Sequence, residues 1–237
     1  PKTSAVDAGG VDQIVGWQQV DPAEDNLWKR ATYGGGKFVA VANTGTNRAM
    51  YSTDGVTWSV SGVTGTTDFK ANAVCYGDKF VAVSANDGGG TLNNVMYSSD
   101  GLSWNQTKQT SDLYDGVTHG AGTYVAVGSE GKAMYSNDGI SWTAATGVPD
   151  GNWIGVIYAD NKFVSVAQNS NSTTNRVMYS TDGITWSVDG VTGFDSNIAY
   201  QSVVYADGKF VAVCSSTTVY YSTDGITWSD SGVTGVV

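Results

Sequence analysis

The sequence predicts an all-β protein: a five-bladed β-propeller of four-stranded antiparallel blades, with an extra N-terminal strand. Three observations lead to this prediction. A motif of the type M-Y-S-T-D-G-I-T-W-S occurs five times, and a second motif of the type Y-A-D-G-K-F-V-A-V precedes each copy. The tryptophans of the five copies are spaced by 46, 38, 44 and 42 residues. This period is close to the roughly forty residues of a four-stranded propeller blade.

Each unit divides into four short strands, A to D. Strand A is the V-x-Y stretch, as in 73–76, and a turn of Gly, Asp, Asn or Lys leads into strand B, F-V-A-V, as in 80–83. A loop of variable length follows, then strand C, V-M-Y-S, and strand D, I-T-W-S. Runs of β-branched and aromatic residues bounded by Gly, Asn and Asp are typical of strands. No stretch has helical periodicity, and none of the three prolines falls within these strands.

The turn between strands C and D repeats the pattern S-x-D-G-x-x-W. Asp-Gly is a strong hairpin signal, because glycine accepts a positive φ and aspartate caps nearby amides. We expect the tryptophan to return to the core and fill the gap between blades, where burial of the ring stabilises the fold by about 2–3 kcal/mol. The repeated residues are Asp54, Gly55, Trp58, Asp100, Gly101, Trp104, Asp138, Gly139, Trp142, Asp182, Gly183, Trp186, Asp224, Gly225 and Trp228.

Residues 13–21, Q-I-V-G-W-Q-Q-V-D, look like one more strand D, with Trp17 in the tryptophan position. The chain therefore divides into 1–27, a segment with a spare or ring-closing strand, and 28–237, the propeller of five repeats. A closed ring is preferred to an open array, because closure removes exposed sheet edges. The spare strand would then lie on the surface or pair with a neighbouring subunit in a homo-oligomer.

Composition excludes several classes of partner. The net charge is −10 and only 14% of residues are charged, which argues against nucleic acid and against anionic membrane surfaces. No apolar run is long enough to span a membrane, and the first twenty residues lack the features of a signal peptide. The two cysteines, Cys75 and Cys214, lie in apolar strands and are read as buried thiols.

The pattern S-x-D-G-x-x-W resembles the Asp-box of sialidase-type propellers, S-x-D-x-G-x-x-W, with one residue fewer between Asp and Gly in all five copies. Together with Y-G-x-G-K-F-V-A-V, it looks like repeats of bacterial surface proteins, phage structural proteins and, more distantly, photosystem II assembly factors. The resemblance covers 28–229. It implies a β-propeller and is much less informative about function.

The residues argue against an enzyme. Five identical copies of a motif make an implausible active site, and one carboxylate per turn falls short of the six to eight ligands of calcium. A sialidase resemblance implies three converging arginines, but Arg48 and Arg176 occupy equivalent repeat positions. Glutamate occurs only at positions 24 and 130, and the single histidine, His119, replaces a repeat tyrosine. We therefore predict no catalytic residues, no metal and no cofactor.

Two features point to a binding face opposite the C–D turns. The B–C loops vary in length and sequence, at 43–47, 86–94, 129–132 and 168–175, and variable loops on a rigid scaffold are common sites of recognition. Aromatic residues also lie at or near the start of strand A: Trp28, Phe69, Tyr114, Trp153 and Tyr200. They either ring the mouth of the central channel as candidate ligand-binding residues, or pack between blades.

Two functions remain open from the sequence. The first is a non-enzymatic structural or adhesion propeller, a phage virion component such as a capsid-decorating or tail-associated protein, on the virion surface and bound to another protein. The alternative is a secreted or cell-surface lectin that binds glycans. An Asp-box glycoside hydrolase is disfavoured by the scarcity of glutamates and arginines.

Overall fold

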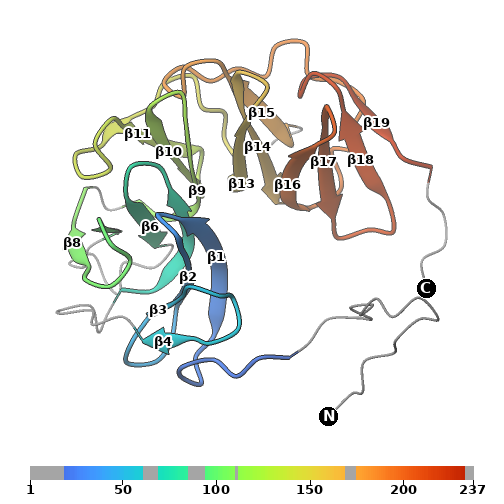
Figure 1. Cartoon of the computed structure of the whole chain (residues 1–237). Helices are drawn as coiled ribbons and strands as arrows, with labels where there is room; N and C mark the ends of the chain where they lie inside the picture. The colour runs from blue at the N-terminus through green and yellow to red at the C-terminus, as the bar shows by residue number, and fades with distance from the viewer. Residues whose placement is uncertain (1–18, 61–68, 85–93, 110–111, 169–174, 233–237) are drawn as a thin grey trace, which may run out of the picture.

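The computed structural model describes residues 19–60, 69–84, 94–109, 112–168 and 175–232. These residues form five antiparallel sheets, arranged as blades around a centre, and contain no helix (Figure 1). The strands of the first three blades are β1 (Trp28–Gly34), β2 (Lys37–Ala42), β3 (Ala49–Ser52), β4 (Ser59–Val60), β5 (Ala71–Tyr76), β6 (Phe80–Ser84), β7 (Val95–Ser98), β8 (Asn105–Thr107), β9 (Tyr114–Gly120), β10 (Thr123–Gly128), β11 (Lys132–Ser136) and β12 (Thr143–Ala144). Those of the last two are β13 (Asn152–Ala159), β14 (Lys162–Gln168), β15 (Val177–Ser180), β16 (Tyr200–Ala206), β17 (Lys209–Cys214), β18 (Val219–Ser222) and β19 (Trp228–Asp230).

The all-β propeller predicted from the repeats is confirmed, with one local difference. Four blades have four strands each, in the order of the sequence. In the fourth blade, strand D is reduced to a bridge in which Tyr179 and Ser187 exchange two backbone hydrogen bonds of 3.0 and 2.9 Å. The segment after this bridge turns away and packs its apolar side chains against the fifth blade, as Val191 does. The fourth blade therefore has three strands and a short remnant of the fourth.

The turn between strands C and D has the hydrogen bonds that its sequence predicts. In the fourth blade, the Asp182 carboxylate accepts from the amides of Ile184 and Thr185, both at 2.8 Å, and from the Ser180 hydroxyl at 2.9 Å. Gly183 has a φ of +76°, a conformation that side chains rarely adopt. The same set of bonds occurs at Asp54, Asp100, Asp138 and Asp224.

The hydrophobic core consists of four clusters, one at each contact between consecutive blades. Each of the first four blades packs two strand-B valines against the blade after it, as Val39 and Val41 do. The following blade covers them with its strand-B aromatic residue and with the tryptophan of its C–D turn, as Phe80 and Trp104 do. The apolar strand B is therefore buried on both faces, which explains why it reads as a continuous hydrophobic run.

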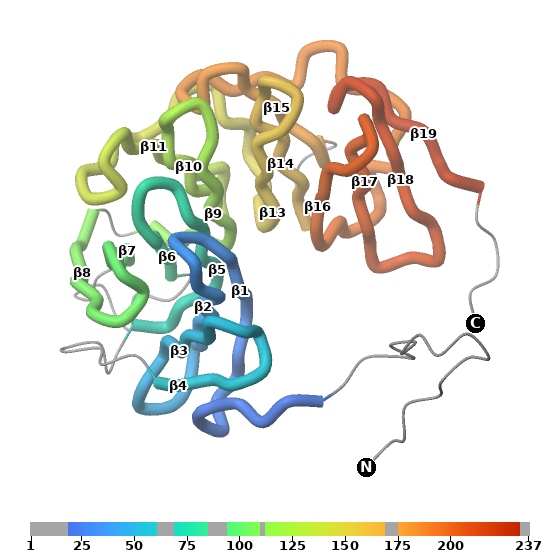
Figure 2. The backbone as a smooth tube through the Cα atoms, viewed as in Figure 1, coloured from blue at the N-terminus to red at the C-terminus, as the bar shows by residue number. Residues whose placement is uncertain are grey.

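The five blades form an arc that does not close. The tube through the backbone passes from the first blade through the others to the last, and the ends of the arc stay apart (Figure 2). Among the described residues, no strand of the first blade has an extensive contact with a strand of the fifth. The closed ring preferred from the sequence is therefore not formed by these blades. The predicted spare strand spans residues 13–21. Residues 13–18 of it lie outside the described part of the chain.

Candidate binding site at the centre of the propeller

The aromatic residues that the sequence places either around the channel mouth or between blades are mostly core residues. Trp153 and Tyr200 are 0% exposed, and Tyr114 and Phe69 are 1% exposed; Trp28 is half-buried. Trp153 donates from Nε1 to the backbone oxygen of Pro149 at 2.9 Å, so its polar group is satisfied internally. A side chain enclosed between blades cannot stack on a sugar, so of the two alternatives the structure supports packing between blades for Phe69, Tyr114, Trp153 and Tyr200. Trp28 is not enclosed in this way.

The residue after Trp28, Tyr114, Trp153 or Tyr200 lines the centre instead, and in the second blade the residue after Ala71 does so. In four innermost strands the pairing register slips at this residue: between 28 and 30, 71 and 73, 153 and 155, and 200 and 202. The fifth innermost strand, β9, slips in the same way between 114 and 116, so Asp115 has no partner in the ladder. Such β-bulges redirect side chains, and they are common next to functional sites. The five bulge residues are Lys29, Asn72, Asp115, Ile154 and Gln201.

The bulge residues line one cavity of about 270 Å³, together with Arg30 and Gln168. Because Gln168 ends β14, the cavity opens at the end of the propeller that carries the B–C loops. The variable B–C loops predict a binding face at this end. Loop residues 85–93 and 169–174 lie outside the described part of the chain, so the predicted loops 86–94 and 168–175 are described only at their ends.

Asp115 is the one acidic residue that lines this cavity, and hydrogen bonds hold its carboxylate in place. The Asp115 carboxylate accepts from Asn72 Nδ2 at 2.8 Å and from Ser129 Oγ at 3.4 Å. Burial raises the pKa of Asp115, and these hydrogen bonds together with the nearby charge of Arg30 oppose that rise. Across the cavity, Gln168 donates to the side-chain oxygen of Gln201 at 3.0 Å. The site thus holds two cations, one anion and three amides.

A second cavity of about 150 Å³ lies deeper along the same axis, since Arg30 and Ile154 line both spaces. Its wall comes from the five innermost strands and includes the side chains of Val74, Val117 and Val203, but more of its accessible surface is polar than apolar. The centre of the arc is therefore polar in both cavities.

The other residues considered from the sequence lie elsewhere. His119 stacks against Tyr124 with 4.4 Å between ring centroids, and burial lowers the pKa of His119, as expected of a packing residue. Arg176 is 3% exposed, and Arg48 donates to the backbone oxygen of Gly45 at 3.0 Å. Of the three arginines only Arg30 lines the cavity. In the described residues, Cys75 is a buried thiol and Cys214 is partly exposed.

The described ranges contain no cluster of three or more His, Cys, Asp or Glu side chains placed to hold a metal ion. They also contain no helix long and apolar enough to cross a membrane.

Comparison with known proteins gives similarity in fold but not in sequence. No protein-family model and no curated protein sequence matches this chain. Among solved structures, the computationally designed Ika8 protein matches with a TM-score of 0.61 and 12% identity, over 85% of this chain and 60% of the Ika8 chain. YCF48 bound to D1 peptide matches with a TM-score of 0.58 and 12% identity, over 85% of this chain and 66% of that one.

YCF48 from Cyanidioschyzon merolae matches with a TM-score of 0.60 and 12% identity, over 87% of this chain and 72% of that chain. At these identities the likeness shows the fold alone. The matched part of this chain spans about two thirds of the YCF48 chain bound to D1 peptide, and less of Ika8. The comparisons therefore support a β-propeller and leave the ligand to be inferred from the central site.

Proposed function

We propose that this protein is a non-enzymatic binding propeller that holds a peptide segment of a protein partner in its central cavity. The observation that supports this most is the contrast within the repeat. The turns and core positions are nearly identical in every blade, whereas the five bulge residues are Lys, Asn, Asp, Ile and Gln. Repeated positions maintain the fold, and one asymmetric set of groups at the centre is what specific recognition requires.

The chemistry of the cavity favours a peptide with an acidic group. Lys29 and Arg30 bring two positive charges to a protein of net charge −10, and neither is in a salt bridge with another described residue. The amides of Asn72, Gln168 and Gln201 match the donors and acceptors of a peptide backbone. YCF48, a protein of the same fold, is seen with a bound peptide.

The more specific proposal is a virion component, decorating a phage capsid or attached to a tail, with a capsid or tail protein as the partner. It rests on the resemblance of the repeats and on the surface rich in Ser, Thr, Asn and Gly. The lectin alternative loses much of its support, because the aromatic faces that a sugar would need are buried.

A peptide-binding experiment tests the proposal. Immobilised full-length protein is offered a random synthetic peptide library split into an acidic pool and a basic pool, and the retained peptides are sequenced. We expect retention from the acidic pool. The affinity of a selected peptide should fall at least about tenfold in the double variant Lys29→Ser/Arg30→Ser, because both cations are lost. A double variant of two lysines outside the cavity, Lys37→Ser/Lys108→Ser, makes the same charge change and should bind normally.

The outcomes separate the alternatives. Failure to retain peptides, or equal affinity in both double variants, would overturn the peptide-binding proposal. Glycan-array binding that is lost in Asn72→Ala/Gln201→Ala would favour the lectin. Virions purified from the source host and probed with antibody against this protein test the virion proposal, which fails if the particles carry none of it.

A further inference from the structure

The two ends of the arc expose opposite halves of the interface that joins consecutive blades inside the chain. We define the trailing face of a blade as the face that meets the next blade, and the leading face as the one that meets the preceding blade. In the first four blades, both strand-B valines of the trailing face are 0% exposed. In the last blade, the equivalent Val213 is 44% exposed. Val204 and Tyr221 of the same face are 54% and 37% exposed.

The leading face of the first blade also exposes side chains that are covered in the other blades. Inside the chain, Tyr76 and Tyr158 lie directly over the glycine that ends strand A of the preceding blade, Gly34 and Gly120. The equivalent Tyr33 of the first blade is 59% exposed. Val56, next to the glycine of the first C–D turn, is 62% exposed. Each end therefore lacks the partner that the other end could provide.

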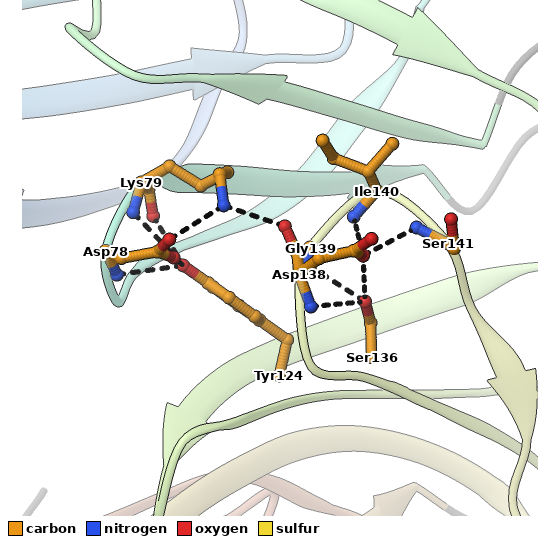
Figure 3. A network of polar contacts seen from close by, with 8 residues as sticks. All are labelled: Asp78, Lys79, Tyr124, Ser136, Asp138, Gly139, Ile140 and Ser141. Carbon is orange, nitrogen blue, oxygen red and sulfur yellow. Dashed lines mark hydrogen bonds and ion pairs between the residues drawn. The ribbon is translucent and has the colours of Figure 1, made fainter.

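The interface between blades also contains polar contacts, and each end of the arc carries one half of such a contact. Lys79 Nζ donates to the backbone oxygen of Asp138 in the next blade at 2.8 Å (Figure 3). Lys162 Nζ donates to the backbone oxygen of Asp224 at 2.7 Å. The equivalent lysine of the last blade, Lys209, is exposed and has no following blade. The equivalent acceptor of the first blade is the backbone oxygen of Asp54.

We propose that the trailing face of the fifth blade binds the leading face of the first blade of a second copy of this protein. The contact would repeat the internal interface. Tyr33 of the second copy would lie over Ala206 of the first, and Gly55 of the second copy would pack against Val211 of the first. Lys209 of the first copy would donate to the backbone oxygen of Asp54 in the second. A second copy is favoured over an unrelated protein because the internal contacts define both halves, and this chain carries each of them.

This contact is head-to-tail, so it joins different surfaces of the two copies. Each added copy offers a new free end, and assembly continues until the ends meet or a helical chain forms. Such a protein would place its central binding sites at regular intervals. Assembly does not depend on the peptide-binding proposal, because the end faces share no residue with the central cavity.

Sedimentation velocity on the full-length protein tests the proposal over about a hundredfold range of concentration, since association follows mass action. We expect species larger than the monomer to grow with concentration. Val213→Glu should disable only the trailing face, and Tyr33→Ser only the leading face, so that each variant alone is monomeric. Both side chains are exposed, so neither change removes a core contact. Ala144→Glu, on the outermost strand of the middle blade, is the matched control and should associate as the unmodified protein does.

The decisive step is to mix the two end variants. Each retains one intact face, so the mixture should form a one-to-one dimer and nothing larger. A monomer at all concentrations would overturn the proposal, and so would a larger species that survives both substitutions. Association that appears only after deletion of residues 1–18 would also overturn it, because the chain's own N-terminal segment would then be the occupant. Val204→Glu and Val56→Glu repeat the test if a first variant does not fold.

Discussion

At the scale of single residues, the turn between strands C and D does two things at once. Its aspartate closes a local hydrogen-bond network, and its glycine touches a valine of the preceding blade. In the fourth blade a Cβ on Gly183 would lie 2.6 Å from Val125 Cγ2, whereas in the first blade a Cβ on Gly55 meets nothing closer than 3.4 Å. Turn geometry and interblade packing thus require the same glycine for separate reasons.

That difference allows the two requirements to be measured separately. Gly183→Ala and Gly55→Ala both place a side chain at a φ near +75°, and each should lose about 1 kcal/mol of unfolding free energy from backbone strain. Gly183→Ala should lose a further 1–3 kcal/mol or so, because the new methyl group overpacks the interblade contact. Urea denaturation of both variants measures the difference. Equal losses would show that the valine contact adds nothing.

The carboxylates of the turns should make stability depend on pH. For Asp182, burial raises the pKa, but the amides of Thr185 and Ile184 and the Ser180 hydroxyl lower it by more, so the net pKa lies below its ordinary value. The unfolded chain therefore takes up the proton first, at a pH of about 4, and the stabilisation present above that pH is lost as pH falls through the folded pKa.

We expect Asp182→Ala to lower the unfolding free energy by about 1 kcal/mol at neutral pH, as for other capping aspartates. The difference from the unmodified protein should shrink steadily below a pH of about 4. Urea titrations at several pH values measure it, and a difference that stays constant with pH would show that the charge is irrelevant. Because the carboxylate is exposed, solvent screening keeps the effect modest.

At the scale of elements, strand order and turn type could be predicted because they depend on local sequence. Which face of the sheet the first side chains of strand A occupy could not be predicted in this way. Simple alternation along a strand fails at the β-bulges after Trp28, Ala71, Trp153 and Tyr200, and bulges have no firm signal in one sequence. One sign is present in the sequence: the bulge residue differs in every repeat, whereas the residue before it is aromatic in four of the five repeats.

Contacts between elements of different blades are equally hard to foresee, and Tyr124 is the clearest case. The other repeats have Phe at this position, as Phe163 shows. The Tyr124 hydroxyl accepts from the amides of Asp78 and Lys79 at 3.0 and 3.1 Å and donates to the Asp78 carboxylate (Figure 3). One side chain thereby joins strand B of the third blade to the A–B turn of the second.

Tyr124→Phe tests this link with little change in volume. We expect a loss of about 1–2 kcal/mol in unfolding free energy, because the hydroxyl bonds a partly buried turn and a carboxylate. Tyr158→Phe is the control, since no hydrogen bond of its hydroxyl is found among the described residues, and it should cost much less. Thermal denaturation compares the two, and the link is unimportant if both variants melt at the same temperature.

At the scale of the whole molecule, an open arc predicts a gradient of stability. In a repeat array, stability is approximately the sum of repeat and nearest-neighbour terms. The third blade has a neighbour on both sides, whereas the first and fifth have one each, and their outer faces stay exposed (Figure 1). Amides of β2 and β17 should therefore exchange hydrogen faster than those of the equivalent β10, since local opening costs least at the ends.

The same experiment connects this gradient with self-association. If copies join head-to-tail, raising the protein concentration covers both ends, and exchange in β2 and β17 should slow while β10 stays unchanged. Val213→Glu and Tyr33→Ser should each remove the concentration dependence and keep the gradient. Uniform exchange in all three strands would mean that the array unfolds as one cooperative unit, so that the neighbour missing at each end has no local effect. A gradient without concentration dependence would separate an intrinsically frayed arc from one that a second copy stabilises.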